Sequence, residues 1–158
     1  MSSVLAIDPG YDRLGLAVFE GDEVRHSECF SPTEKEFGLR LLAINKRVSE
    51  VIDTFSPDAV AIETLFFTKN QKTAMRVAEA RGVIILAVLQ AHIPLFEYSP
   101  QEVKIAVTGI GNASKDAVMR MVPRLIKLPA GNRKDDEFDA IALGYAHQAN
   151  KRLNRAGL

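Results

Sequence analysis

The sequence predicts one α/β domain, built on a mixed five-stranded sheet with helices on both faces. Two observations favour this class. Short apolar runs of strand length alternate with longer segments whose apolar residues recur at helical spacing. Tight turns join the first runs, whereas helix-length segments separate the later ones, a pattern typical of an antiparallel meander followed by parallel crossovers. We expect residues 1–150 to form this single domain and residues 151–158 a short basic tail.

The first three strands are expected to form the meander. An apolar run over residues 4–8 ends at Pro9, and a second over 14–20 is followed by Gly21. Residues 23–30 alternate in pattern and follow the second run through a tight hairpin.

Three further segments extend the sheet. Apolar residues at helical spacing predict a helix over 37–55, which ends before Ser56-Pro57. Residues 58–63 contain the run Ala-Val-Ala-Ile and predict a buried strand parallel to the first. A second helix is expected over 70–92 and a fifth strand over 94–98.

The C-terminal third is expected to hold two helices. Ser114 is a candidate N-cap for a helix that reaches Leu125, and Pro123 should kink this helix or end it earlier. Glycines between Lys104 and Lys115 predict a loop. The last helix is expected over 135–150, which completes the order β-β-β-α-β-α-β-α.

Composition excludes several classes of protein. Cys29 is the single cysteine, so no intramolecular disulfide can form, and the sequence has no zinc-ligand spacing. No apolar run reaches the roughly 18 residues that span a bilayer, and the N-terminus lacks a secretory signal pattern. We therefore expect a cytoplasmic protein without a membrane partner.

The charge is unevenly distributed although the net charge is zero. Residues 1–63 hold 6 Lys or Arg against 12 Asp or Glu, and residues 64–158 hold 14 against 8. If cations neutralise some of the acids, a basic surface suited to nucleic acid remains. A harmless scatter of charges over a solvated surface is the alternative.

Two carboxylates are expected at one edge of the sheet. Asp8 ends the first strand and Glu63 ends the fourth, so parallel pairing of these strands would bring both side chains to the same C-terminal edge. Close carboxylates repel one another unless a cation neutralises them. The alternatives are a turn in which Asp8 caps its own backbone and a Glu63 that points to water.

Further acids open the last helix. Asp135 and Asp136 both share a face with Asp139, so helical geometry leaves open which of the two would join it. First-turn acids also complement the helix dipole, but Asp139 lies beyond the first turn at the edge of the apolar face. Oxygen ligands without a Cys or His cluster suit Mg²⁺ or Mn²⁺.

Five segments in register resemble the motifs of the RuvC-type Holliday junction resolvases. They are Ala6 to Gly10 with Gly15, Ala61 to Asn70, Glu79 to Val83, Val103 to Lys115, and Leu128 to His147. The resemblance implies an RNase H-like fold and an endodeoxyribonuclease that resolves four-way DNA junctions by paired nicks, in recombination and repair. It also selects Asp136 over Asp135, so that Asp8, Glu63, Asp136 and Asp139 become the catalytic metal ligands.

The mechanism expected from these acids is metal-dependent phosphodiester hydrolysis. Two Mg²⁺ ions, for which Mn²⁺ can substitute, would lie about 4 Å apart and leave 5′-phosphate products. Lys104 and Lys115 are the expected phosphate contacts, and the resemblance implies that one of them, assigned here as Lys104, also acts in catalysis.

Other expectations concern the DNA and protein partners. Phe66 or Phe67 could stack on a base, and by resemblance Phe66 is the wedge at the junction centre; Lys69 is a further candidate contact. The near two-fold symmetry of a junction favours a homodimer, with the helix over 70–92 as the candidate interface. The resemblance also implies a junction-binding protein and a branch-migration ATPase as partners.

Three other functions compete with this interpretation. The opening motif also resembles the phosphate-binding hairpin of actin-like ATPases and sugar kinases, although those folds need two such domains. A catalytically idle module that binds branched DNA is the second alternative. The third is a related nuclease that cuts RNA–DNA hybrids or flaps.

Overall fold

The structure is a computed structural model that describes residues 1–65 and 70–156. Its centre is one mixed sheet with the strand order β3-β2-β1-β4-β5. The strands are β1 (Ser3–Asp8), β2 (Leu14–Glu20), β3 (Glu23–Phe30), β4 (Ala59–Glu63) and β5 (Leu95–Tyr98). β1 to β3 form an antiparallel meander, and β4 runs parallel to both β1 and β5. The predicted sheet is therefore confirmed.

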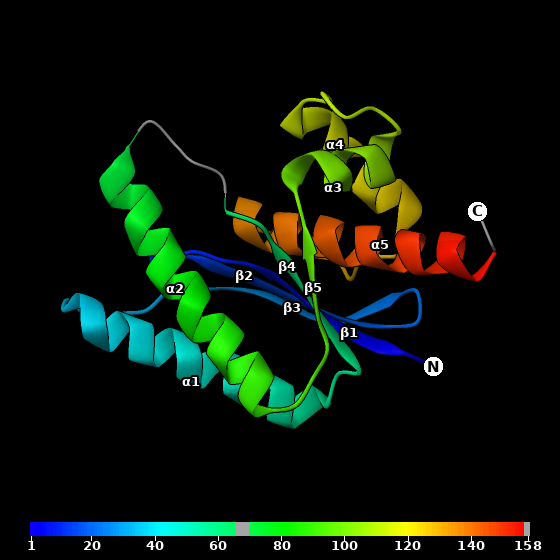
Figure 1. Cartoon of the computed structure of the whole chain (residues 1–158). Helices are drawn as coiled ribbons and strands as arrows, with labels where there is room; N and C mark the ends of the chain where they lie inside the picture. Colours follow the sequence, from blue (N-terminus) through cyan, green and yellow to red (C-terminus); the bar gives the residue numbers. More distant parts are fainter. Residues whose placement is uncertain (66–69, 157–158) are drawn as a thin grey trace.

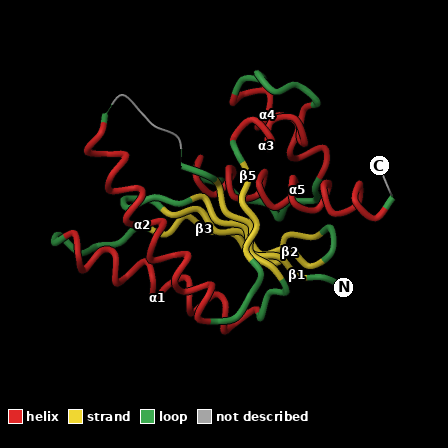
Figure 2. Tube along the Cα trace, viewed as in Figure 1, coloured by secondary structure: helices red, strands yellow, loops and turns green. Residues whose placement is uncertain are grey.

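Helices cover both faces of the sheet (Figures 1 and 2). One face carries α1 (Phe37–Phe55) and α2 (Gln71–Gln90), and the other carries α3 (Pro100–Thr108), α4 (Lys115–Leu125) and α5 (Asp135–Arg155). Within the described ranges, no helix is both long and apolar enough to cross a membrane.

The two layers enclose separate cores because side chains alternate along each strand. On β1, Leu5 and Ile7 pack with α1 and α2, whereas Val4 and Ala6 pack on the side of α5. The smaller side chains let α5 lie close to the sheet. At Gly144 of α5, an added Cβ would overlap the ring of Phe19 on β2. Tight packing against β1 and β2 thus fixes the helix that carries several predicted site residues.

The segment before Gly109 departs from expectation, since residues 100–108 form α3, a helix that the prediction did not include. A capping box starts it: the Glu102 backbone N–H donates to Ser99 Oγ (3.2 Å), and the Ser99 backbone N–H donates to Glu102 Oε2 (2.6 Å). Lys104 therefore lies on a helix. The predicted loop is confined to the residues between α3 and α4.

Two helix ends also differ from the prediction. α4 continues two residues beyond Pro123, which close to a helix end forfeits a single backbone hydrogen bond. α5 continues to Arg155 instead of ending near Asn150. Arg152 and Arg155 lie in its last turn, where positive charge favours the helix dipole, and Arg152 pairs with Asp22.

Candidate active site

Asp8 and Glu63 lie side by side at the C-terminal ends of two central strands. In the parallel register of β1 and β4, Ile7 is the partner of Ile62, so the next residue on each strand is one of the two acids. The predicted juxtaposition of these carboxylates is confirmed.

Both acids line a hollow of about 240 Å³ between the sheet edge and helices α3, α4 and α5. Asp139 enters it from α5, Lys104 from α3 and Lys115 from the first residue of α4. We call this hollow the acid–lysine hollow. Its other described lining residues are Pro100, Val103, Val118 and Ala142.

The carboxylates in this hollow resist ionisation. Burial raises the pKa of Asp8 from 3.8 to about 8, and the neighbouring charges of Glu63, Asp139 and Asp136 add to the rise. Burial also raises the pKa of Glu63 from 4.5 to about 7, with a further contribution from Asp139. A site whose acids repel one another in this way favours a bound cation.

Lys115 opposes this repulsion within the protein. Its Nζ lies 3.4 Å from Asp135 Oδ2 and 3.4 Å from Asp139 Oδ2. Burial raises the pKa of Asp139, and the ammonium group of Lys115 opposes that rise. The same ammonium limits the rise in the pKa of Asp8 and Glu63, and Lys104 also limits the rise in the pKa of Glu63. The positive charges of the two lysines therefore neutralise part of the negative charge of the acids.

Asp136 lies to one side of the other acids. It is not among the described residues that line the acid–lysine hollow, and its Oδ2 lies 3.0 Å from Arg13 Nε. Charge from Asp136 still reaches Asp8 and Asp139, where it helps to raise both pKa values. Asp136 thus belongs to the same cluster but is turned toward the β1–β2 turn.

A glycine makes this arrangement possible. Gly15 of β2 is the register partner of Asp8, and an added Cβ there would overlap the backbone carbonyl of Asp136. The first turn of α5 can therefore rest directly on the strand pair that carries Asp8. The spacing of the acids on β1 and α5 depends on this close contact.

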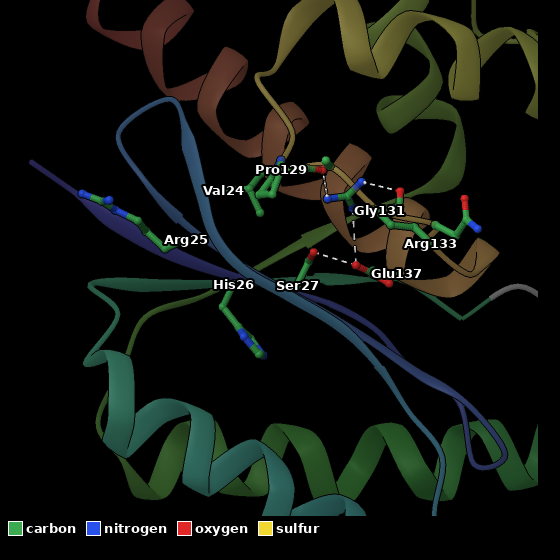
Figure 3. Close-up of a pocket in the computed structure, with 10 residues that line it drawn as sticks. Val24, Arg25, His26, Ser27, Pro129, Gly131, Arg133 and Glu137 are labelled. Atoms are coloured by element: carbon green, nitrogen blue, oxygen red, sulfur yellow. Dashed lines mark hydrogen bonds and ion pairs between the residues drawn. The ribbon is translucent and has the colours of Figure 1, made fainter.

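A second hollow, of about 290 Å³, shows what anchors the start of α5 (Figure 3). Ser27 Oγ of β3 donates to Glu137 Oε1 (2.7 Å), and Arg133 Nε lies 3.4 Å from the same oxygen. Arg133 also donates to the Pro129 carbonyl oxygen (2.6 Å), which orders the loop before the helix. These contacts tie the first turn of α5 to β3 and so fix Asp136 and Asp139.

Donor chemistry at the cluster suits a divalent cation, but the side chains are not yet arranged around one. Among the described residues, no three acidic, His or Cys side chains stand close enough together to hold an ion. Arg13 and Lys115 hold Asp136 and Asp139 in ion pairs instead. Asp136 Oδ2 is buried and has no hydrogen bond, which is uncommon for a buried carboxylate oxygen. Binding of a metal would therefore have to rearrange these side chains.

The structure thus brings together most of the predicted site. Three acids and two lysines meet at one hollow, namely Asp8, Glu63, Asp139, Lys104 and Lys115. Asp136 lies beside it, and Asp135 contacts Lys115. The predictions for Phe66, Phe67 and Lys69 lie outside the described residues.

Arg13 was missed by sequence analysis. It lies two residues before Gly15 in the turn that follows the Asp-Pro-Gly motif. A basic residue so close to a candidate ligand was the available signal, but its partner is more than a hundred positions away along the chain.

Comparison with known proteins gives a consistent result. The family model described as "Crossover junction endodeoxyribonuclease RuvC" matches residues 4–147. Proteins of that description from Thermotoga maritima and Thermosipho melanesiensis are 40% and 44% identical to this chain. The alignments cover 96% and 90% of this chain and 94% of each relative. This agreement favours the nuclease over the ATPase alternative.

Solved structures agree with the sequence relatives. The structure titled "T. thermophilus RuvC in complex with Holliday junction substrate" matches 98% of this chain and 97% of its own, with a TM-score of 0.89 and 33% identity. The yeast mitochondrial Holliday junction resolvase Ydc2 has a TM-score of 0.65 at 14% identity, which supports the RNase H-like fold alone. With its fold, its acidic sheet edge and these matches in agreement, the chain belongs to the RuvC family of crossover junction endodeoxyribonucleases.

Proposed function

We propose that this nuclease resolves four-way DNA junctions by Mg²⁺-dependent hydrolysis at the acid–lysine hollow. The observation that carries the proposal is the convergence of Asp8, Glu63 and Asp139 from β1, β4 and α5 on one hollow that two lysines share. The relative of known structure that carries a Holliday junction substrate covers nearly the whole chain, which supports the choice of DNA substrate.

Asp8, Glu63, Asp136 and Asp139 are the residues that would hold the metal. Nucleases of this family depend on a metal, and an all-carboxylate donor set favours Mg²⁺, with Mn²⁺ as a substitute. Four carboxylates suffice for two ions. When bound, such ions activate a water nucleophile and neutralise charge that develops on the phosphate, and the products then carry 5′-phosphate and 3′-hydroxyl ends.

The lysines would act on the scissile phosphate. Lys104 and Lys115 line the hollow from two different helices, so a phosphate that enters it meets positive charge beside the carboxylates. We assign Lys104 to stabilisation of the transition state, since Lys115 is held by Asp135 and Asp139. Lys115 would bind phosphate once a metal takes over Asp139, one of its two carboxylate partners.

Substrate contacts at Phe66 and Lys69 stay predictions from the sequence. They come three and six residues after Glu63, which ends β4 and lines the hollow. A phenylalanine that stacks on an unpaired base contributes about 1–3 kcal/mol. Phe66→Ala should therefore weaken cleavage of junctions, whereas normal cleavage by this variant would remove the wedge from the proposal.

A homodimer would place two such sites on one junction. Two opposed nicks need two sites related by a two-fold axis. Three large apolar side chains on α2 support this helix as the interface, since Met75, Leu86 and Leu89 are 64%, 51% and 57% exposed. Sedimentation equilibrium should show a dimer that Leu86→Glu converts to monomer; a monomeric unsubstituted protein would contradict it. The junction-binding protein and branch-migration ATPase stay predictions from the resemblance.

One experiment separates this function from its alternatives. The protein is incubated with Mg²⁺ and, separately, with a labelled four-way junction, a matched duplex and an RNA–DNA hybrid. The proposal predicts paired symmetric nicks in the junction alone, with ligatable 5′-phosphate ends. Binding without cutting would favour the idle module, and cleavage of the hybrid alone would favour the related nuclease.

A further inference from the structure

The Asp136 carboxylate forms an ion pair with the guanidinium group of Arg13. Arg13 Nε lies 3.0 Å from Asp136 Oδ2, and the carboxylate is absent from the described lining of the acid–lysine hollow. Nearby, Asp139 does line the hollow, although it lies only one helical turn further along α5. The two acids of the same helix therefore face different surroundings.

Hydrogen bonds from helix α1 fix the turn that carries Arg13. Arg40 of α1 donates from Nε to the Tyr11 carbonyl oxygen (3.2 Å) and from Nη2 to Asp12 Oδ1 (2.8 Å). These bonds hold the residues just before Arg13 against the start of α1. The side chain of Arg13 itself is 55% exposed, so it can leave its partner without disturbing the core.

The contact with Arg13 leaves the carboxylate incompletely satisfied. Asp136 Oδ2 is buried and has no hydrogen bond, although the guanidinium lies within ion-pair distance. A charge–charge contact without hydrogen-bond geometry at a half-exposed arginine is weak. A divalent cation that offers a direct bond to this oxygen can therefore replace it.

We propose that Arg13 is a positioning residue that stands in for the metal on Asp136, and that a divalent cation must displace it to recruit this carboxylate. The inference rests on the proposed metal site. Removing Arg13 should release Asp136 toward Asp8 and Asp139.

The inference predicts the direction of a change in metal affinity. Because metal binding no longer has to break the ion pair, Arg13→Ala should tighten binding of Mn²⁺ by about two- to fivefold. An arginine that instead held Asp136 ready for the metal would have the opposite effect. Loss of Arg13 would then weaken binding.

Binding is measured by the electron paramagnetic resonance signal of free Mn²⁺ during titration of the DNA-free protein, so no cleavage enters the readout. The control is Arg25→Ala on β3. Arg25 has similar exposure, 51%, and pairs with Glu20 (2.6 Å) away from the described lining of the acid–lysine hollow. This control should bind Mn²⁺ as the unsubstituted protein does, with unfolding temperatures unchanged in both variants.

A double-mutant cycle separates the ion pair from general repulsion between Arg13 and the metal. If Arg13 acts through Asp136, Arg13→Ala should change Mn²⁺ affinity only while Asp136 is present and should have no effect in Asp136→Asn protein. An equal gain in both backgrounds would overturn the inference, as would unchanged or weaker binding by Arg13→Ala alone. Failure of the unsubstituted protein to bind Mn²⁺ would instead overturn the proposed metal site, and with it this inference.

Discussion

The backbone carbonyl of Asp136 lies in the space that a Cβ on Gly15 would fill. Gly15 is also the register partner of Asp8, so a single glycine brings the start of α5 against the strand that carries the most perturbed carboxylate. The relation between strand and helix, and not either element alone, sets the spacing of the acids.

Gly15→Ala should therefore harm both the fold and the site. The added methyl group must push α5 away from β2, because the atom it meets is backbone and cannot rotate aside. Overpacking of this kind costs about 1–3 kcal/mol. We expect a lower unfolding temperature and a loss of junction cleavage that exceeds the loss of folded protein, measured by calorimetry and by cleavage at a temperature where the variant is folded.

Gly82→Ala is the matched control. Gly82 lies in α2, where an added Cβ would meet nothing within 4 Å, and alanine favours a helix over glycine. This variant should be as stable as the unsubstituted protein or more so. A Gly15→Ala protein with the stability and cleavage rate of the unsubstituted protein would contradict the positioning argument.

Stability without metal should fall as the pH rises. Asp8 and Glu63 have folded-state pKa values raised to about 8 and about 7, so the folded protein keeps protons that the unfolded chain releases above about pH 4. The stability that these two acids contribute to the folded state is fully present below about pH 4 and is lost as the pH rises through their folded-state pKa values of about 7 and about 8. Between pH 5.5 and 8.5 in EDTA, the free energy of unfolding should fall by on the order of 2 kcal/mol.

The control for this pH dependence is Asp8→Asn, which cannot ionise at that position. Thermal unfolding in EDTA should show a clearly flatter dependence on pH for this variant, and its stability at pH 8.5 should exceed that of the unsubstituted protein. Equal slopes for the two proteins would show that Asp8 does not contribute to the fall in stability with pH.

Lys115→Ala should weaken binding of a four-way junction and flatten its salt dependence. Loss of one phosphate contact lowers the slope of log affinity against log salt by about 1. Binding is measured in Ca²⁺ at several salt concentrations, with Lys46→Ala, an exposed lysine on α1, as the control. An unchanged slope for Lys115→Ala would remove Lys115 from the DNA interface.

Much of the fold could be predicted because periodicity and local turn signals specify each element. The apolar run that ends at Asp8 and the run that ends at Glu63 required parallel strands, which placed these acids together. Helix α3 was missed because it is only nine residues long, although Ser99-Pro100 with Glu102 is a helix-start signature that was available.

The orientation of individual acids was less predictable. Helical spacing could not separate Asp135 from Asp136, and the structure shows that each has a different cationic partner, Lys115 and Arg13. Those partners come from a helix and a turn far apart in sequence. Such ion pairs depend on how α5 packs on the sheet, which no local pattern encodes.

Cleavage by carboxylate variants is the sharpest test of catalysis at the acid–lysine hollow. Asp8→Asn and Glu63→Gln keep the size of each side chain but remove charge from the acid–lysine hollow, and they are assayed for binding and for cutting of a four-way junction in Mg²⁺. We expect both variants to bind the junction and each to cut it at least about 100-fold more slowly than the unsubstituted protein. Cleavage at the unsubstituted rate by both variants would contradict this expectation.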